Sequence, residues 1–125
     1  MDANSYMWVL CDKIAKIIHT TKEEVYRKAI REVGVFDDVG VLEEAVASLV
    51  DTWGKNGIGF FSEIFDTELT ALNGKRMKKV RLYKGSHHYS QPELSRLIDF
   101  IVEEAKGLNI ETLTAEKIKE LENGV

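Results

Sequence analysis

The sequence predicts a mainly helical α+β fold of about five helices with one β-hairpin (58–66 and 77–84). Two observations lead to this class. Apolar residues recur at helical spacing in several segments, and an Asn-Gly pair follows a stretch rich in aromatic and β-branched residues. A third observation bounds the size, because 125 residues with 44% hydrophobic content suffice for one buried core. We therefore expect a single domain over residues 1–125.

The predicted helices have clear start and stop signals. We expect helices at 2–19, 21–33 and 41–54, one from Ser90 to Gly107, and a short one after Thr114. Thr-Lys-Glu-Glu and Ser-Gln-Pro-Glu are capping boxes that begin the second and fourth of these helices. The segment 36–40 is expected to be a turn between the second and third helices.

The hairpin is predicted to close at Asn73-Gly74, because both residue types tolerate the positive φ that a type I′ turn requires. On the return strand, Val80 and Leu82 should face the core. The alternate residues Lys79, Arg81 and Tyr83 should then face solvent. One face of this strand would present two cations and an aromatic ring.

Positive charge is concentrated around this return strand. The chain has formal charge −4, yet no acidic residue lies between Leu69 and Pro92 and six basic residues do. Such a segment in an otherwise acidic chain is typical of an anion-binding surface, and nucleic acid is the anion we expect. The alternative is that the cations only protect a strand edge from aggregation.

The candidate DNA-binding residues follow from this charge and from the loop after the strand. Tyr83 offers a π face for a base, and Gly85-Ser86 before a helix start could present N–H groups and a hydroxyl to a phosphate. A second basic strip lies on the predicted second helix at Arg27, Lys28 and Arg31. The candidate set is Lys75, Arg76, Lys78, Lys79, Arg81, Tyr83, Lys84, Gly85, Ser86, His87 and Arg96.

We expect no catalytic residue, no metal and no cofactor. The adjacent His87 and His88 point in different directions on most backbones and lack further ligands nearby. No nucleophile motif is present. The single Cys11 lies in an apolar helical pattern and is expected to be buried. No apolar run could cross a membrane, and the acidic start predicts a cytoplasmic protein.

Two segments resemble the phage NinB/Orf recombination-protein family, which occurs in lambdoid phages and in Gram-positive phages and prophages. The stretch Asp2–Trp8 is similar to the family's L-D-x-N-x-x-x-W helix start. The stretch Tyr83–Ser90 is similar to a G-S-polar-x-Y block of the Gram-positive members. The stretch Glu93–Asp99 is similar to the M-S-R-L-I-D block that follows it. The stretch Gly107–Thr114 is similar as well.

The resemblance implies a homodimeric recombination mediator that binds single-stranded DNA and the host single-strand-binding protein, with no catalysis and no metal. It also implies that the protein acts in the cytoplasm of a bacterial host cell. Lambdoid members carry a further N-terminal segment before the aspartate, whereas this chain opens at Met1-Asp2, so we expect either a trimmed chain or a branch without that segment. The residues on matching motif positions are Gly85, Ser86, Tyr89, Ser95 and Arg96.

The sequence leaves several functions open. The first is a non-catalytic accessory protein of phage recombination that binds single-stranded or branched DNA. The second is a structure-selective nuclease or a nuclease-associated domain. The third is a winged-helix regulator, with 21–33 and 41–54 as its helix pair and 58–84 as its wing. The fourth is a protein–protein interaction module without a nucleic-acid role.

Overall fold

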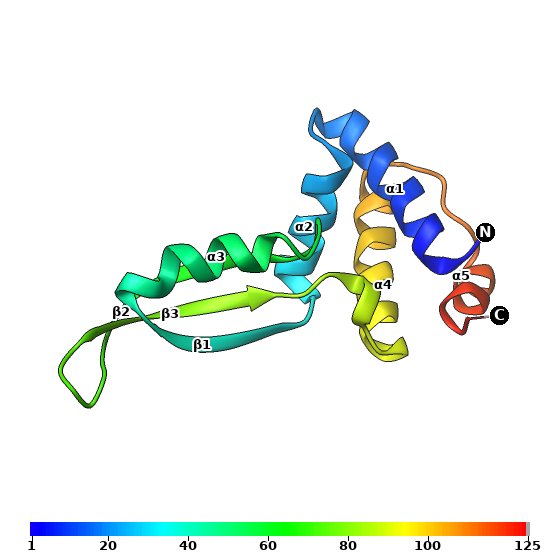
Figure 1. The fold of residues 1–125 in the computed structure, drawn as a ribbon. Helices are drawn as coiled ribbons and strands as arrows, with labels where there is room; N and C mark the ends of the chain where they lie inside the picture. Colours follow the sequence, from blue (N-terminus) through cyan, green and yellow to red (C-terminus); the bar gives the residue numbers. More distant parts are fainter. Residues whose placement is uncertain (125) are drawn as a thin grey trace. The chain divides into compact units, whose positions relative to one another are not determined.

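The computed structural model describes residues 1–124, apart from the side chains of residues 67 and 68. It confirms the predicted class, a mainly helical α+β fold, with five α-helices and one three-stranded antiparallel sheet in these residues (Figure 1). The chain divides into two compact units. We call residues 1–34 with 86–124 the helical unit and residues 35–85 the strand unit. One domain over residues 1–125 stays a prediction.

The helical unit is built on three mutually packed helices, α1 (Ala3–Ile18), α2 (Lys22–Val33) and α4 (Gln91–Gly107). A short fourth helix, α5 (Ala115–Glu122), contacts α1 and α4. Each helix buries the apolar stripe that the sequence shows, since that stripe must leave water to stabilise the helix. The largest fully buried aliphatic side chains of this core are Met7, Leu10, Ile30, Leu97, Ile98 and Ile101.

The helix starts follow the sequence signals. The Thr21 hydroxyl accepts the Glu24 N–H at 3.2 Å, at the start of α2. At α4 the capping box is complete, because Ser90 accepts from the Glu93 N–H while the Glu93 carboxylate accepts from the Ser90 N–H. These bonds satisfy backbone donors that have no partner within the helix.

The strand unit contains β1 (Phe36–Leu42), a 3-10 turn (Glu43–Ala45), α3 (Val46–Gly54), β2 (Phe61–Thr70) and β3 (Arg76–Tyr83). The strand order is β1-β3-β2, so β3 is the central strand and pairs antiparallel with both neighbours. Helix α3 packs on one face of this sheet, where Val46, Val80 and Leu82 form the buried centre. Partly buried residues surround it, namely Val39, Val41, Leu49, Val50 and Trp53.

Two predictions around β1 were wrong. The segment expected as a turn, 36–40, is strand, and the helix expected from residue 41 begins only at Val46. The physical reason is that Val39 and Val41 alternate along β1 and pack beside Val80 under α3, which outweighs local helix propensity. A strand therefore separates the two helices that the winged-helix alternative takes as a pair.

The hairpin is confirmed, but its strands are β2 and β3 rather than 58–66 and 77–84, and its turn is not type I′. The loop has three residues, Leu72 to Gly74, closed by the Ala71 N–H donating to the Lys75 carbonyl at 2.9 Å. Within this loop only Gly74 has a positive φ, at 83°. The side chain of Asn73 instead accepts a hydrogen bond from the Lys75 N–H. This is the arrangement of a three-residue hairpin loop with glycine in the left-handed position.

Candidate nucleic-acid interface

The two faces of β3 carry different side chains. Val80 and Leu82 lie on the face that α3 covers and are buried, as predicted. Lys79, Arg81 and Tyr83 alternate with them and lie on the opposite face. Across this second face, β1 supplies Phe36 and Asp38, and β2 supplies Phe65. We call Phe36, Asp38, Phe65, Lys79 and Arg81 the β3 cluster.

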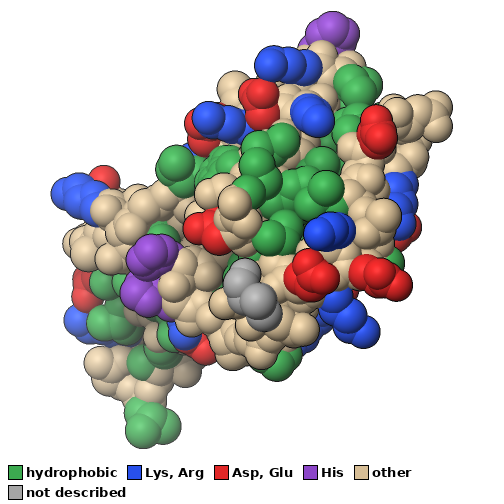
Figure 2. Space-filling model, turned by 90° about the vertical axis from the view of Figure 1, so that its right-hand side faces the viewer, with side chains coloured by type: hydrophobic (Ala, Val, Ile, Leu, Met, Phe, Trp, Pro, Cys, Tyr) green, Lys and Arg blue, Asp and Glu red, His purple; other side chains and the backbone are tan. Residues whose placement is uncertain are grey.

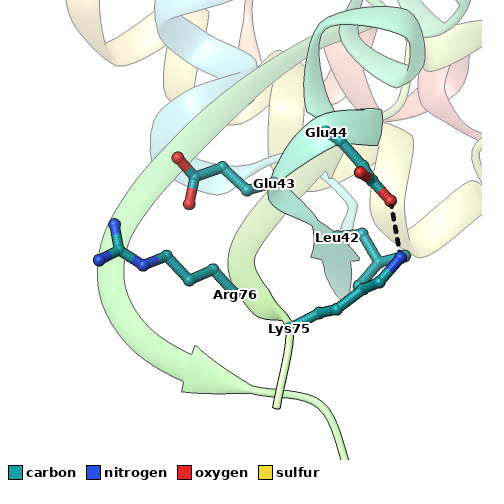
Figure 3. A pocket seen from close by; sticks show the side chains of 5 residues that line it. All are labelled: Leu42, Glu43, Glu44, Lys75 and Arg76. Carbon is teal, nitrogen blue, oxygen red and sulfur yellow. Dashed lines mark hydrogen bonds and ion pairs between the residues drawn. The ribbon is translucent and has the colours of Figure 1, made fainter. Parts of the chain in front are cut away.

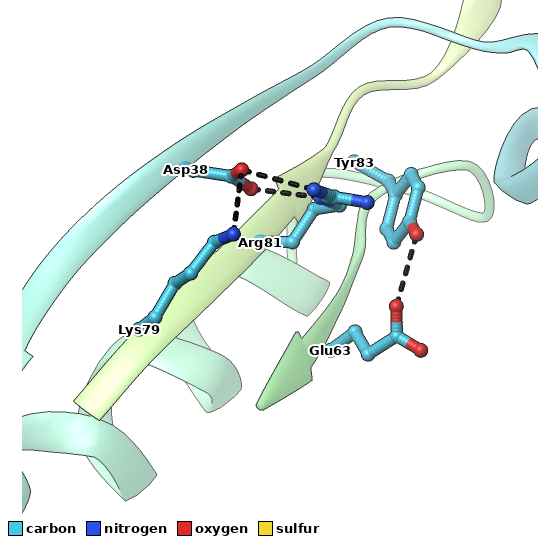
Figure 4. A network of polar contacts seen from close by, with 5 residues as sticks. All are labelled: Asp38, Glu63, Lys79, Arg81 and Tyr83. Carbon is cyan, nitrogen blue, oxygen red and sulfur yellow. Dashed lines mark hydrogen bonds and ion pairs between the residues drawn. The ribbon is translucent and has the colours of Figure 1, made fainter. Parts of the chain in front are cut away.

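Asp38 lies at the centre of the β3 cluster (Figure 4). Arg81 donates from Nε to Asp38 Oδ1 at 2.8 Å and from Nη2 to Oδ2 at 3.0 Å, which is a bidentate pair. Lys79 Nζ lies 3.3 Å from Asp38 Oδ2. The hydrogen bonds from Arg81 and Lys79 lower the pKa of the Asp38 carboxyl to about 2, and Asp38 raises the pKa of Arg81. All three groups are therefore charged at neutral pH.

Two phenylalanine rings flank these charges. The Arg81 guanidinium carbon lies 4.0 Å from the centroid of Phe36 and 5.0 Å from that of Phe65. Lys79 Nζ lies 4.8 Å from the Phe65 centroid. Cations at these distances are attracted to the ring face. Phe36 retains 41% exposure, so the cluster offers solvent an aromatic surface beside fixed cations.

Three of the four other cations of the basic run are also paired. Lys75 meets Glu44 at 3.5 Å, Lys78 meets Asp66 at 2.9 Å, and Lys84 meets Asp37 at 2.8 Å. Lys75 and Arg76 line an open pocket next to the turn of the hairpin, with Glu43 and Glu44 across from them (Figure 3). Of the six cations, Arg76 alone forms no ion pair with a side chain that the structure describes.

The positive charge that the sequence concentrates between Leu69 and Pro92 is therefore largely balanced by acidic partners in the structure. Residues 35–85 contain seven Lys and Arg and eight Asp and Glu, so the strand unit has formal charge −1. Four of these eight acids lie on β1 and the turn after it, outside the stretch from Leu69 to Pro92 in which the sequence concentrates the cations. Outside the strand unit, basic and acidic side chains are also intermixed on the face drawn in Figure 2, which is seen from the side of α1 and α5. A missed signal was the alternation Val39-Gly-Val41, which is typical of a strand and would have placed Asp37 and Asp38 beside the cations.

Tyr83 does not present a π face to solvent, which corrects the sequence prediction. It is 1% exposed, and its ring stacks on Phe61 with centroids 4.5 Å apart and planes at 16°. Its hydroxyl donates to Glu63 Oε2 at 3.1 Å, and its carbonyl accepts the Trp53 indole N–H at 2.8 Å. Tyr83 thus anchors β3 within the strand unit, and Phe36 is the aromatic residue that stays accessible.

The Gly85-Ser86 segment is structural rather than a phosphate cradle. Ser86 is buried, its N–H donates to the Tyr26 hydroxyl at 2.8 Å, and its own hydroxyl bonds the same oxygen at 2.7 Å. A Cβ on Gly85 would lie 2.9 Å from the Phe60 ring, so only glycine fits without a shift. The Ser86 N–H and hydroxyl, which we expected to contact a phosphate, thus bond the Tyr26 hydroxyl within the helical unit.

The remaining candidates lie in the helical unit. His87 and His88 are exposed in a 3-10 turn at Ser86–His88, with ring centroids 5.6 Å apart. Arg96 is exposed on α4. In the second basic strip, Arg27 bonds Glu24 at 2.6 Å. The site described here uses the strand unit alone, so it includes none of these residues.

Comparison with protein-family models, with curated proteins and with solved structures gives no match to this chain. The resemblance to the NinB/Orf family stays a prediction. Within residues 1–124, no helix is long and apolar enough to cross a membrane. No group of three or more His, Cys, Asp or Glu side chains in that range is arranged to hold a metal ion.

Proposed function

We propose that this chain is a non-catalytic accessory protein of phage recombination that binds single-stranded DNA through the β3 cluster. The observation that carries the proposal is the exposed ring of Phe36 beside the guanidinium of Arg81, on a face of a β-sheet. Single-stranded nucleic acids bind to such surfaces because unpaired bases stack on aromatic rings while cations contact the backbone. The resemblance to the NinB/Orf family supports the same role.

The paired cations determine how such binding would respond to salt. Six free cations would give a slope of about −4 in log affinity against log salt, since each phosphate contact on a single strand contributes about −0.7. Here most cations already have an acidic partner, so a phosphate that approaches them replaces a carboxylate. We therefore expect a shallow slope of about −1, with stacking supplying most of the affinity.

The test is fluorescence anisotropy of labelled oligothymidylate and of a labelled duplex, at low and near-physiological salt. The proposal predicts tighter binding of the single strand and the shallow salt slope. Phe36→Leu keeps the apolar contact but removes the ring, so it should weaken binding roughly tenfold, the loss of one base stack. Phe100→Leu on α4 is the matched control and should leave binding unchanged. No binding of either oligonucleotide at low salt contradicts the proposal.

We further propose that the chain is a homodimer, as the resemblance implies. The excess of aromatic and apolar residues near 53–65 would also favour an interface, but the aromatic residues there have contacts within the strand unit. Trp53 packs edge-on against Phe60, and Phe61 stacks on Tyr83. The dimer proposal therefore depends on the resemblance alone. Light scattering at micromolar concentration should give about twice 14.2 kDa, and the mass of one chain contradicts it.

A further inference from the structure

We propose that Lys79 and Arg81 form a preformed phosphate site. In the protein without DNA the carboxylate of Asp38 fills this site, and a DNA phosphate displaces it on binding. This inference deepens the proposed function and rests on it. Asp38 would then set the affinity of the β3 cluster for nucleic acid. Its removal would strengthen DNA binding rather than weaken it.

The geometry around Asp38 is that of anion recognition. Two N–H groups of Arg81 meet two oxygens of one carboxylate at 2.8 and 3.0 Å, and Lys79 approaches the second oxygen at 3.3 Å. An arginine fork binds carboxylate and phosphate in the same two-pronged way, and a lysine beside it adds a point charge. The cations are therefore already oriented for a phosphate oxygen pair.

The exposure of these groups makes an exchange feasible. The side chains of Asp38, Lys79 and Arg81 keep 32%, 36% and 25% of their accessible surface. Ion pairs that water reaches contribute little net stability, because solvent screens them. A phosphate can therefore replace Asp38 at small cost, whereas a buried pair would resist exchange. The two phenylalanine rings hold the cations in place on either side while the anion changes.

A purely structural role for Asp38 is the competing explanation. Asp38 and Arg81 are directly paired across β1 and β3, so the ion pair also connects the edge strand to the central strand. If Asp38 has only this structural role, removal of its charge would lower the stability of the sheet and leave the DNA affinity unchanged or reduced. Only displacement by phosphate predicts a gain in affinity.

Asp38→Asn separates the two explanations, because it removes the charge and keeps the shape. We expect oligothymidylate to bind roughly tenfold more tightly at low salt, with the salt slope steeper by about 1.4 units, since two cations become free for phosphate. Asp66→Asn is the matched control. It makes the same charge change and frees Lys78, whose partner Asp66 lies outside the β3 cluster and is 96% exposed.

The outcomes distinguish this inference from the proposed function. A gain for Asp38→Asn with little change for Asp66→Asn supports the phosphate site. Equal gains in both variants overturn it, because net charge then explains the effect. If a folded Asp38→Asn protein binds oligothymidylate only as tightly as wild type does, the phosphate site is overturned. The proposed function then still stands, because the wild-type protein binds DNA. Failure of wild type and both variants to bind at low salt overturns both.

A measurement on the wild-type protein keeps the inference testable if Asp38→Asn does not fold. The Arg81 Nε–Hε signal in a nitrogen-15 NMR spectrum reports the partner of that group. Titration with oligothymidylate should shift this signal as phosphate replaces Asp38. An Arg81 signal that stays in place at saturating oligothymidylate overturns the inference.

Discussion

The Ser86–Tyr26 pair and the Asp38–Arg81 pair are both short polar contacts between residues far apart in the sequence, yet they differ in burial. Ser86 and Tyr26 are buried in the helical unit. Asp38 and Arg81 lie within reach of water in the strand unit. Burial makes a polar contact expensive to break, because each freed group then lacks a partner. Exposure makes it exchangeable, because water or a ligand can replace either partner.

Residue type alone does not identify a binding group. Serine after glycine at a helix start and lysine on a strand both look available in the sequence. In the structure Ser86 is buried and bonded to Tyr26, whereas Lys79 and Arg81 pair with the exposed carboxylate of Asp38, which we propose that a phosphate displaces.

Gly34 lies in close contact with its neighbours in the helical unit. A Cβ there would lie 2.5 Å from the Ile30 carbonyl oxygen and 2.7 Å from the Tyr89 hydroxyl. Gly34→Ala should therefore lower the free energy of unfolding by about 3 kcal/mol, since backbone must move. Gly107→Ala is the matched control, because nothing lies within 4 Å of its Cβ, and it should change stability by less than about 1 kcal/mol. Urea unfolding followed by circular dichroism measures both, and equal effects would contradict the packing at Gly34.

The buried hydroxyl of Tyr26 should give the next largest effect. Tyr26→Phe leaves the Ser86 N–H and hydroxyl without their partner, so the free energy of unfolding should fall by about 2 kcal/mol. Tyr6→Phe removes one bond, from the part-buried Leu113 N–H at 2.9 Å, and should cost about half as much. The same urea titration compares them. A Tyr26→Phe protein as stable as wild type would show that this contact is as exchangeable as an exposed one.

Glu122 is a buried acid without a full set of partners, since its Oε2 bonds no group among the described residues. Burial and the neighbouring Asp99 raise its pKa to about 7 from an ordinary 4.5. The folded state therefore holds a proton that the unfolded state releases, and stability should fall as pH rises from about 4.5 through about 7.

Glu122→Gln should remove this pH dependence and stabilise the protein above pH 7 by on the order of 1 kcal/mol. Near pH 4.5 the variant and wild type should match. Glu120→Gln, an exposed position on the same helix, is the control and should leave the profile unchanged. Thermal unfolding across this pH range is the measurement, and a flat wild-type profile is the contrary result.

The smallest stability effect is expected at Asp38. Its pKa is lowered to about 2, chiefly by the hydrogen bonds from Arg81, so its contribution is present above the ordinary value of 3.8 and lost as pH falls through about 2. Asp38→Asn should be slightly less stable than wild type at neutral pH, and the gap should close in acid. A large loss at neutral pH, comparable with Tyr26→Phe, would place Asp38 among the structural contacts.

The sequence predicted the helical unit well, because its signals are local. N-terminal caps and apolar stripes act within a few residues, and Thr21 and Ser90 occupy the cap positions that those signals require. The strand β1 was missed because seven residues with two adjacent acids resemble a turn. Only pairing with β3 and packing under α3 stabilise it as a strand.

The candidate site was less predictable, because it depends on which strands become neighbours. A count along the chain separates Asp38 from Arg81 by 43 residues, although sheet register pairs them. The aromatic ring beside the cations is Phe36 rather than Tyr83 for the same reason. Tyr83 is buried because it stacks on Phe61, a contact between strands that no local pattern reveals.

In the proposed function, DNA contacts the β3 cluster and not the Gly85-Ser86 segment. Amide chemical shifts of nitrogen-15-labelled protein, recorded during titration with oligothymidylate, measure which residues lie at the contact. We predict changes at Phe36, Asp38, Lys79 and Arg81. Gly85 and Ser86 should stay unperturbed, because Ser86 bonds the Tyr26 hydroxyl and Gly85 packs against the Phe60 ring. Changes confined to residues 85–96, with the β3 cluster unaffected, would contradict this prediction.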